Sequence, residues 1–242
     1  MKKLRFISLI VLFTLVITFA MAGETLAAKP TKVTTTTINY TALGDSIAFG
    51  IGADLYYGYV GRYRDYLDSL LNTDVNLSNQ SFPGDDTSDL LFKVKYYSWV
   101  RTDIANANLI TISIGGNNIL GYASDNYTVI DEVGAQQGVD KFKTEWSLIM
   151  NEIRALNKTA TVKVLNLYNP YPVDDPNYAL ADSLIQQLNL ESSEKASVYN
   201  YTVIDAYTAF AGNSCTYTHF CDSTPDVHPT NSGYALIAEL HR

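Results

Sequence analysis

Short β-prone runs alternate along this chain with longer stretches that have helical spacing. The strand-like runs occupy residues 38–43, 75–79, 108–114, 161–170 and 202–207. The run at 108–114, NLITISI, is apolar and β-branched and lacks the alternation of a sheet that faces water on one side. We therefore expect it to form a buried central strand.

Between these runs lie stretches whose apolar residues recur every three or four positions, as on one face of a helix. The clearest is 139–157, and others are 59–71 and 179–197, with a last helix starting at Thr230. The apolar face of the first of these consists of Val139, Phe142, Trp146, Ile149, Ile153 and Leu156. Strands alternating with helices predict an α/β fold: a three-layer α/β/α sandwich around a mostly parallel sheet, with the working site at the carboxyl ends of the strands.

Residues 1–22 are organised like a cleaved export signal. Three basic residues precede an apolar run from Phe6 to about Ala20, and the small-x-small sequence Ala20-Met21-Ala22 follows. The apolar run is shorter than the roughly 20 residues needed to span a bilayer. We expect a secreted protein with no stable membrane span after cleavage, although the cut could fall as late as residue 27. A Thr-rich lead-in at 23–37 then precedes one folded domain at 38–242.

Charge and cysteine content narrow the possible partners. The 242 residues carry a net charge of −8, and loss of Lys2, Lys3 and Arg5 with the leader makes it −11. Such an acidic surface disfavours binding to nucleic acid or anionic lipid. In an exported protein the close pair Cys215 and Cys221 predicts a disulfide, because zinc would need more ligands than this pair and His219 supply.

Four loop or strand-end segments have unusual polar or glycine content. In chain order they are LGDS (43–46), FPGDD (82–86), SIGGNN (113–118) and PDVHPT (225–230). Ser46 alone would be read as a turn or helix-capping serine, since Ser, Asp and Gly favour such positions. The four segments in this order resemble the SGNH hydrolases, also called the GDSL esterase and lipase family. The resemblance covers about 38–240, so it implies that 38–242 is an SGNH hydrolase domain with a flavodoxin-like fold.

The resemblance also implies the role of each residue. Ser46 would be the nucleophile and His228 the general base, because a serine hydroxyl attacks a carbonyl effectively only when an imidazole takes its proton. The oxyanion hole would be formed by the backbone N–H groups of Ser46 and Gly84 and the side-chain amide of Asn117. No metal and no organic cofactor is implied.

Two positions depart from the family pattern. The family usually shows D-x-x-H, but residue 225 is Pro. We favour Asp226 as the acid that orients His228, and Asp222 or the carbonyl of Pro225 are the alternatives. Asn118 stands where the family commonly has Asp, and we expect a structural consequence there rather than a catalytic one.

Residues around these motifs are expected to have structural or pocket-lining roles. The G-x-S-x-G elbow of other serine esterases is absent at Ser46, and we expect Asp45 to support the turn by local hydrogen bonds. His219 and His241 lack a comparable context and are predicted to be surface or loop residues. Tyr-rich segments at 55–59 and 168–172 are the expected walls of the pocket.

These observations predict a secreted serine esterase or lipase that works through an acyl-serine intermediate. Its substrate would be a lipid or short-chain ester, a lysophospholipid, or an acetyl group on a polysaccharide. No long apolar lid helix is evident, which favours small or water-soluble esters. The alternative is a catalytically silent exported domain that binds a glycan in the same cleft.

Overall fold

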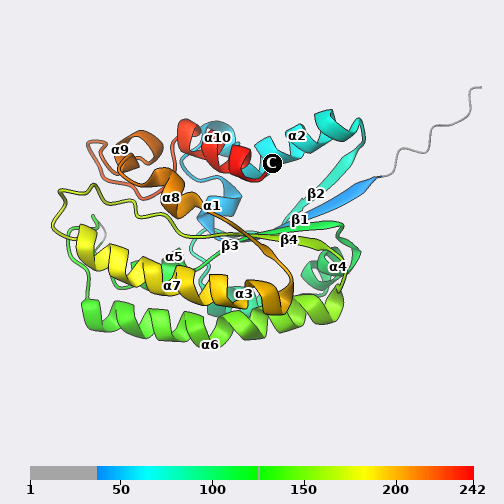
Figure 1. The fold of residues 1–242 in the computed structure, drawn as a ribbon, viewed down its shortest axis with the longest axis horizontal. Coiled ribbons are helices and arrows are strands. Elements are labelled where there is room, and N and C mark those ends of the chain that lie inside the picture. Colours follow the sequence, from blue (N-terminus) through cyan, green and yellow to red (C-terminus); the bar gives the residue numbers. More distant parts are fainter. Residues whose placement is uncertain (1–36, 125) are drawn as a thin grey trace, which may run out of the picture. The chain divides into compact units, whose positions relative to one another are not determined.

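Five parallel strands form the centre of this computed structural model, as Figure 1 shows. They are β1 (Ile38–Gly44), β2 (Val75–Asn79), β3 (Leu109–Ser113), β4 (Thr161–Leu165) and β5 (Thr202–Ile204). The structure describes residues 37–124 and 126–242, so the predicted leader and most of the lead-in lie outside the described residues. Both described ranges belong to one unit bounded by Thr35 and Arg242.

The strand order is β2-β1-β3-β4-β5, so the sheet divides between β1 and β3 into a half with β1 and β2 and a half with β3, β4 and β5. The order of connection reverses there, and the loops after β1 and β3 diverge to opposite faces of the sheet. In parallel sheets ligands bind at such a point, beyond the carboxyl ends of the strands. The LGDS and SIGGNN segments follow these two strands, so the topology brings them together.

Within the described residues, one face of the sheet is covered by five helices, including the two longest, and these helices lie together in Figure 1. They are α3 (Thr87–Tyr96), α4 (Ser98–Asn106), α5 (Gly116–Leu120), α6 (Glu132–Leu156) and α7 (Tyr178–Tyr199). Their core contains the predicted apolar face of α6, with Trp146 fully buried and its indole N–H donating to the Tyr201 hydroxyl at 3.0 Å. This face holds the larger apolar core, which includes Ile110 and Ile112 of β3.

The second core lies on the other face and is rich in tyrosine, with Tyr40, Tyr59 and Tyr234 fully buried. Its helices are α1 (Ser46–Phe49), α2 (Tyr59–Leu71), α8 (Ala206–Phe210) and α10 (Asn231–Leu240), with the short η1 (Asp54–Tyr56) and α9 (Ser214–Tyr217) in adjoining loops. The predicted three-layer α/β/α sandwich with a parallel sheet is therefore confirmed. No helix within 37–124 or 126–242 is long and apolar enough to cross a membrane.

Several predicted boundaries differ from the observed ones. Strands expected to reach residues 170 and 207 end at Leu165 and Ile204. Asp205 ends β5, because its carboxylate accepts a hydrogen bond from the Thr208 N–H at 3.0 Å and so begins α8. Helices α3 and α4 were not predicted at all, although a capping box formed by Asp86 and Asp89 starts α3.

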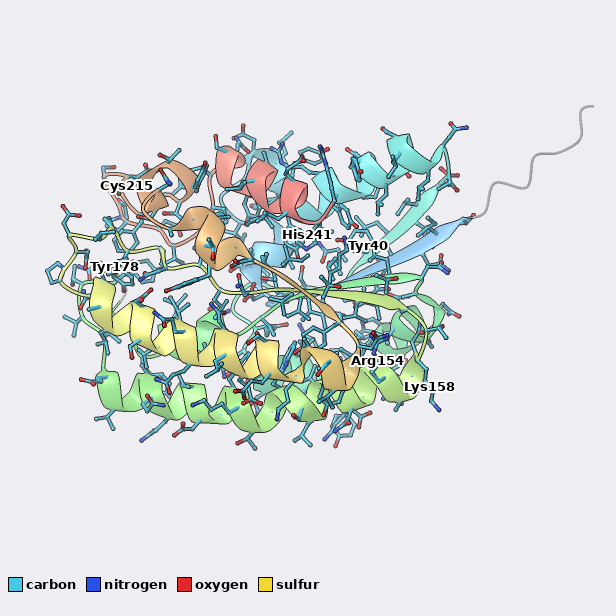
Figure 2. The ribbon with its side chains drawn as sticks, viewed as in Figure 1. Tyr40, Arg154, Lys158, Tyr178, Cys215 and His241 are labelled. Atoms are coloured by element: carbon cyan, nitrogen blue, oxygen red, sulfur yellow. A yellow bond between two sulfur atoms is a disulfide. The ribbon has the colours of Figure 1, made fainter. Side chains whose placement is uncertain are left out.

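The expectation that His241 is a surface residue is wrong. Its ring is fully buried against α2, where it stacks on Tyr59 with 4.8 Å between ring centroids, and Figure 2 shows it close to Tyr40 of β1. The Nδ1 atom lies 2.8 Å from the carbonyl oxygen of Ile237, and burial lowers the pKa of His241 to about 4. An uncharged imidazole in this position packs as an aromatic core residue.

Candidate active site

Ser46 is held at the carboxyl end of β1 by a turn that depends on Gly44 and Asp45. Gly44 has φ +135°, and a Cβ atom there would lie 1.9 Å from the carbonyl oxygen of Ser113 on the neighbouring strand. Asp45 caps α1 by accepting the N–H of Ile47 at 3.0 Å, which is the local support expected from the sequence. Ser46 is thus the first residue of a short helix at the strand end.

A line of contacts joins Ser46 to His228 and Asp226. The Nε2 atom of His228 is 2.8 Å from the Ser46 hydroxyl oxygen, and its Nδ1 atom is 2.5 Å from Oδ1 of Asp226. The same carboxylate oxygen accepts the backbone N–H of His228 at 3.0 Å, and this hydrogen bond closes the turn at 226–228. Asp222, the other candidate acid, lies elsewhere, 2.8 Å from Nδ1 of His219.

Gly84 and Asn117 lie on the wall of the same open cavity as Ser46 and His228, whose volume is about 650 Å³. Gly84 has φ +90°, a left-handed conformation that favours glycine, and open space surrounds the position of a Cβ atom. The residues singled out in LGDS, FPGDD, SIGGNN and PDVHPT therefore converge from four loops.

Asp85 connects the two loops that carry Gly84 and Asn117. Its backbone carbonyl accepts a hydrogen bond from the Asn117 side-chain amide at 2.8 Å. Its buried carboxylate forms an ion pair with Lys93 of α3. Because an amide nitrogen has two N–H groups, Asn117 retains a second donor while the first fixes its orientation.

Asn118 is buried, and its side-chain hydrogen bonds go to groups of α3 and α6. Its side chain accepts the backbone N–H of Thr87 at 3.2 Å and donates to the Thr87 hydroxyl at 2.8 Å and to the carbonyl of Gly138 at 3.3 Å. It thus joins α3, α5 and α6, which agrees with a structural rather than a catalytic consequence at this position.

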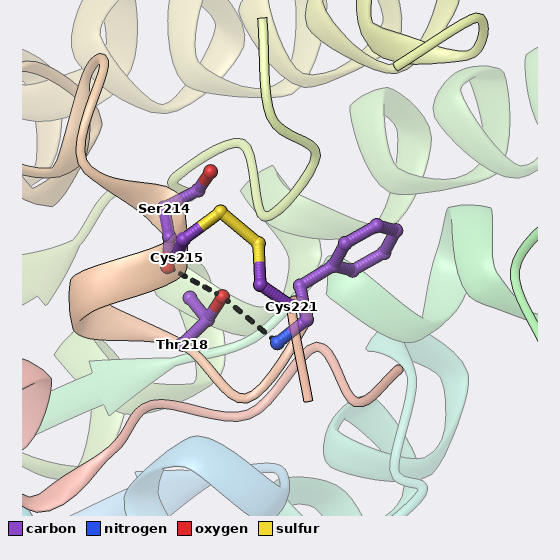
Figure 3. Close-up of a disulfide and its surroundings, with 5 residues drawn as sticks. Ser214, Cys215, Thr218 and Cys221 are labelled. Atoms are coloured by element: carbon purple, nitrogen blue, oxygen red, sulfur yellow. Dashed lines mark hydrogen bonds between the residues drawn. A yellow bond between two sulfur atoms is a disulfide. The ribbon is translucent and has the colours of Figure 1, made fainter. Parts of the chain in front are cut away.

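The predicted disulfide between Cys215 and Cys221 is formed, in the segment that precedes His228. Figure 3 shows the bridge beside Thr218, whose hydroxyl donates to the carbonyl of Ser214 at 2.8 Å and accepts the N–H of Phe220 at 3.3 Å. The bridge closes a small loop next to the histidine segment.

Within this loop, His219 has a structural role that the sequence did not reveal. Its backbone N–H donates to the carbonyl of His228 at 3.0 Å, and its carbonyl accepts the N–H of Asp226 at 3.2 Å. Its Nε2 atom is 3.0 Å from the carbonyl oxygen of Gly52, in the turn that follows Ser46. Only the folded chain brings residues 52 and 219 together, so neighbouring sequence could not identify this contact.

A second, narrower pocket opens beside Ser46, with a volume of about 70 Å³. Its lining is mostly apolar: Ile119, Leu120, Ile130, Leu167, Pro170, Tyr171, Ala181, Ile185 and Val227 form much of it, together with the polar residues Asp45, Ser46 and Asn117. The expected wall at 168–172 therefore lines this pocket. The other expected wall, at 55–59, does not line this pocket: Tyr59 is buried in the core, and Leu55 and Tyr56 project into solvent.

The carboxyl groups of Asp45, which precedes Ser46, and Asp226, which contacts His228, have opposite pKa shifts. Burial raises the pKa of Asp45 to about 7, against its hydrogen bond from Ile47 and the nearby His228. Partial burial also acts to raise the pKa of Asp226, but the hydrogen bonds from the His228 ring and backbone hold it below its ordinary value. Asp226 is thus the group that stays ionised beside the imidazole. Among the described residues, no three His, Cys, Asp or Glu side chains are grouped to hold a metal ion.

A family model for the GDSL-like lipase/acylhydrolase family matches residues 42–236, which include all four motif segments. The chain belongs to this family. It is 31% identical over 211 residues to the spore germination lipase LipC of Bacillus licheniformis, an alignment that covers 85% of this chain and 95% of LipC. The recognition of an SGNH/GDSL hydrolase from the sequence is confirmed.

Solved structures of the family share the fold. The lipase Lip_vut3 from a goat rumen metagenome is 30% identical, with a TM-score of 0.71 over 85% of this chain and 96% of that one. An extracellular lipase from Streptomyces rimosus is 20% identical, with a TM-score of 0.65 over 84% and 98%. This GDSL protein is accordingly a serine carboxylic-ester hydrolase.

Proposed function

We propose that this GDSL hydrolase is an exported lipase or esterase that cleaves esters of apolar acyl groups through an acyl-serine intermediate on Ser46. The observation that carries the proposal is the line of contacts from Ser46 through His228 to Asp226 on the wall of an open cavity. Export is supported by the leader-like sequence, by the disulfide and by the relative named as an extracellular lipase.

In the first half of the reaction, the Ser46 oxygen attacks the ester carbonyl carbon while Nε2 of His228 takes the hydroxyl proton. The carbonyl π electrons move to its oxygen, and the N–H groups of Ser46 and Gly84 with the Asn117 amide stabilise the resulting negative charge. Losing one such donor typically costs about 2.7–4 kcal/mol of barrier. His228 then protonates the departing alcohol oxygen as the tetrahedral intermediate collapses to the acyl-enzyme.

In the second half, His228 takes a proton from water as the water oxygen attacks the acyl carbon. Collapse of this second intermediate breaks the bond to Ser46, whose oxygen recovers the proton from His228, and the carboxylic acid leaves. Asp226 keeps the Nδ1 atom of His228 protonated and the ring oriented, and it stabilises the imidazolium that forms in each half. Its lowered pKa supports this role.

The two cavities support an assignment of the two parts of the ester. The narrow apolar pocket beside Ser46 suits the acyl chain, because burial of methylene groups is favourable there. The open cavity, with polar groups on its wall, suits the alcohol part. This division favours acyl chains longer than acetyl and therefore a lipase or esterase over a polysaccharide acetyl-esterase.

The test is hydrolysis of p-nitrophenyl acetate, butyrate and decanoate by the purified protein, with a fluorophosphonate label located by mass spectrometry. Ser46→Ala should lose both the label and the turnover. Ser193→Ala is the matched control, because it removes an exposed serine hydroxyl of α7 that donates to the carbonyl of Leu190 and lines neither cavity at Ser46. Equal background rates in wild type and Ser46→Ala, with no label on Ser46, would refute the mechanism and leave a silent binding domain.

A further inference from the structure

Large apolar side chains stand exposed on the three segments around the mouth of the Ser46 cavity. The wall of the cavity includes Ile51 from the turn 50–58, Pro83 and Gly84 from the turn 82–86, and Ser124 and Tyr127 from the loop 120–130. Each of these segments also carries an outward-facing apolar residue. We call Leu55, Tyr56, Phe82 and Val129 the apolar rim: Leu55 is 96% exposed, and the other three are 61–63% exposed.

The turn that carries Leu55 and Tyr56 is held in one conformation by hydrogen bonds. Leu55 and Tyr56 have φ values of +53° and +56°, a left-handed conformation that is unfavourable for such side chains. The turn is closed by backbone hydrogen bonds, among them Tyr57 N–H to the Asp54 carbonyl at 2.9 Å. It is tied to α10 because the Asp54 N–H donates to the Asn231 side chain at 3.1 Å and its carboxylate accepts the Asn231 amide at 2.7 Å. A turn held this firmly keeps Leu55 and Tyr56 in solvent.

The form of the rim indicates what could cover it. A side chain with nearly all of its surface exposed projects outward, so it fits a soft medium into which it can insert. The segments that carry the rim also contribute to the wall of an open cavity of about 650 Å³, which a rigid protein partner would leave empty. An aggregate of ester molecules would bury the rim and at the same time supply the cavity with substrate. Aromatic and aliphatic side chains of this kind anchor proteins at lipid–water interfaces.

Charge indicates the kind of aggregate. The chain has a net charge of −8, which opposes binding to an anionic surface. We propose that the apolar rim adsorbs to aggregated neutral or zwitterionic ester lipids and so places the mouth of the cavity against its substrate. This inference rests on the proposed function, since the reason for adsorption is delivery of an ester to Ser46.

The test uses one substrate, tributyrin, below and above its solubility limit. Leu55→Asn combined with Tyr56→Asn removes the apolar groups, and asparagine tolerates the left-handed backbone at both sites. The matched control is Leu70→Gln with Val198→Gln, two exposed apolar residues on α2 and α7. The rim variant should lose about tenfold in rate on the emulsion and keep its rate on dissolved tributyrin, because adsorption but not the cavity is changed. The control should match wild type on both.

Flotation with phosphatidylcholine vesicles separates the rim from the chemistry. Ser46→Ala protein should float with the vesicles, and the same protein with the rim substitutions should not. If wild type hydrolyses no ester but Ser46→Ala still floats through the rim, the proposed function fails and the adsorption stands. Equal emulsion rates with and without the rim, or a rim variant that only converts a dimer to a monomer, would overturn the inference.

Discussion

Asp45 precedes Ser46, and its buried carboxyl group makes folding stability depend on pH. Its pKa is about 7 in the folded protein, above the ordinary 3.8, so the native state binds more protons than the unfolded chain between these values. Stability from this group is therefore full below about pH 4 and declines as the pH rises through 7. In this window, ionisation forces a charge into a site whose burial disfavours it.

We predict that Asp45→Asn removes this dependence. Asparagine keeps an oxygen that can accept the Ile47 N–H and is a good helix cap, but it does not ionise. The stability of the variant relative to wild type should rise by a few kcal/mol, roughly, between pH 4.5 and pH 8. Urea unfolding at these pH values measures the difference, with Asp140→Asn on the exposed face of α6 as the control for loss of a carboxylate. A difference that stays constant with pH would contradict the assignment.

The strands Ile38–Gly44 and Leu109–Ser113 show which secondary-structure elements the local sequence can predict. Both strands were predicted, and β3 gave the clearer signal because its β-branched run is fully buried in the parallel sheet, whereas the first two residues of β1 are only partly buried. Helices α3 and α4 were missed because exposed aromatic residues hide their apolar faces. Phe92, Tyr96 and Trp99 project outward, while the core contacts come from Leu90, Val94, Val100 and Ile104.

The loop closed by Cys215 and Cys221 contacts the catalytic segment through His219, whose backbone groups bond to His228 and Asp226. Cys215→Ser combined with Cys221→Ser should therefore lower kcat as well as thermal stability. A disulfide that closes so short a loop contributes about 2 kcal/mol, which corresponds to roughly 4–8 °C in the melting temperature of a domain of this size. Misplacement of the imidazole should reduce turnover about tenfold at 25 °C, where the protein remains folded.

The comparison needs both quantities from the same preparation: a thermal melt and kcat on a soluble ester. Reduction of the wild-type disulfide is the independent control, since it opens the loop without changing the sequence. Full turnover combined with a lowered melting temperature would show that the disulfide supports only the fold.

At the scale of the whole molecule, the order of the motifs predicted more of the site than any motif did alone. Ser46, Gly84, Asn117 and His228 lie far apart in sequence, and the parallel sheet brings their loops to one cavity. Contacts set by tertiary packing could not be predicted. The link from His219 to Gly52 is one, and the burial of His241 is another.

The acyl pocket depends on the same long-range assembly, and one of the α7 residues that line it is small. Ala181 of α7 is buried and lines the pocket together with Ser46, although 134 positions separate them. A larger side chain at this position would occupy space that a long acyl chain needs. We predict that Ala181→Val and then Ala181→Leu progressively lower the ratio of decanoate to butyrate hydrolysis.

The ratio is the decisive quantity, because overpacking a core typically costs about 1–3 kcal/mol and could lower both rates through partial unfolding. Ala238→Leu is the matched control: it enlarges a buried alanine in the core on the other face of the sheet. It should change stability without changing the ratio. If the Ala181 variants lost both substrates equally, the pocket would not hold the acyl chain, and the open cavity would have to bind both parts of the ester. A stepwise fall confined to the longer ester would instead assign the acyl chain to the space between Ser46 and α7.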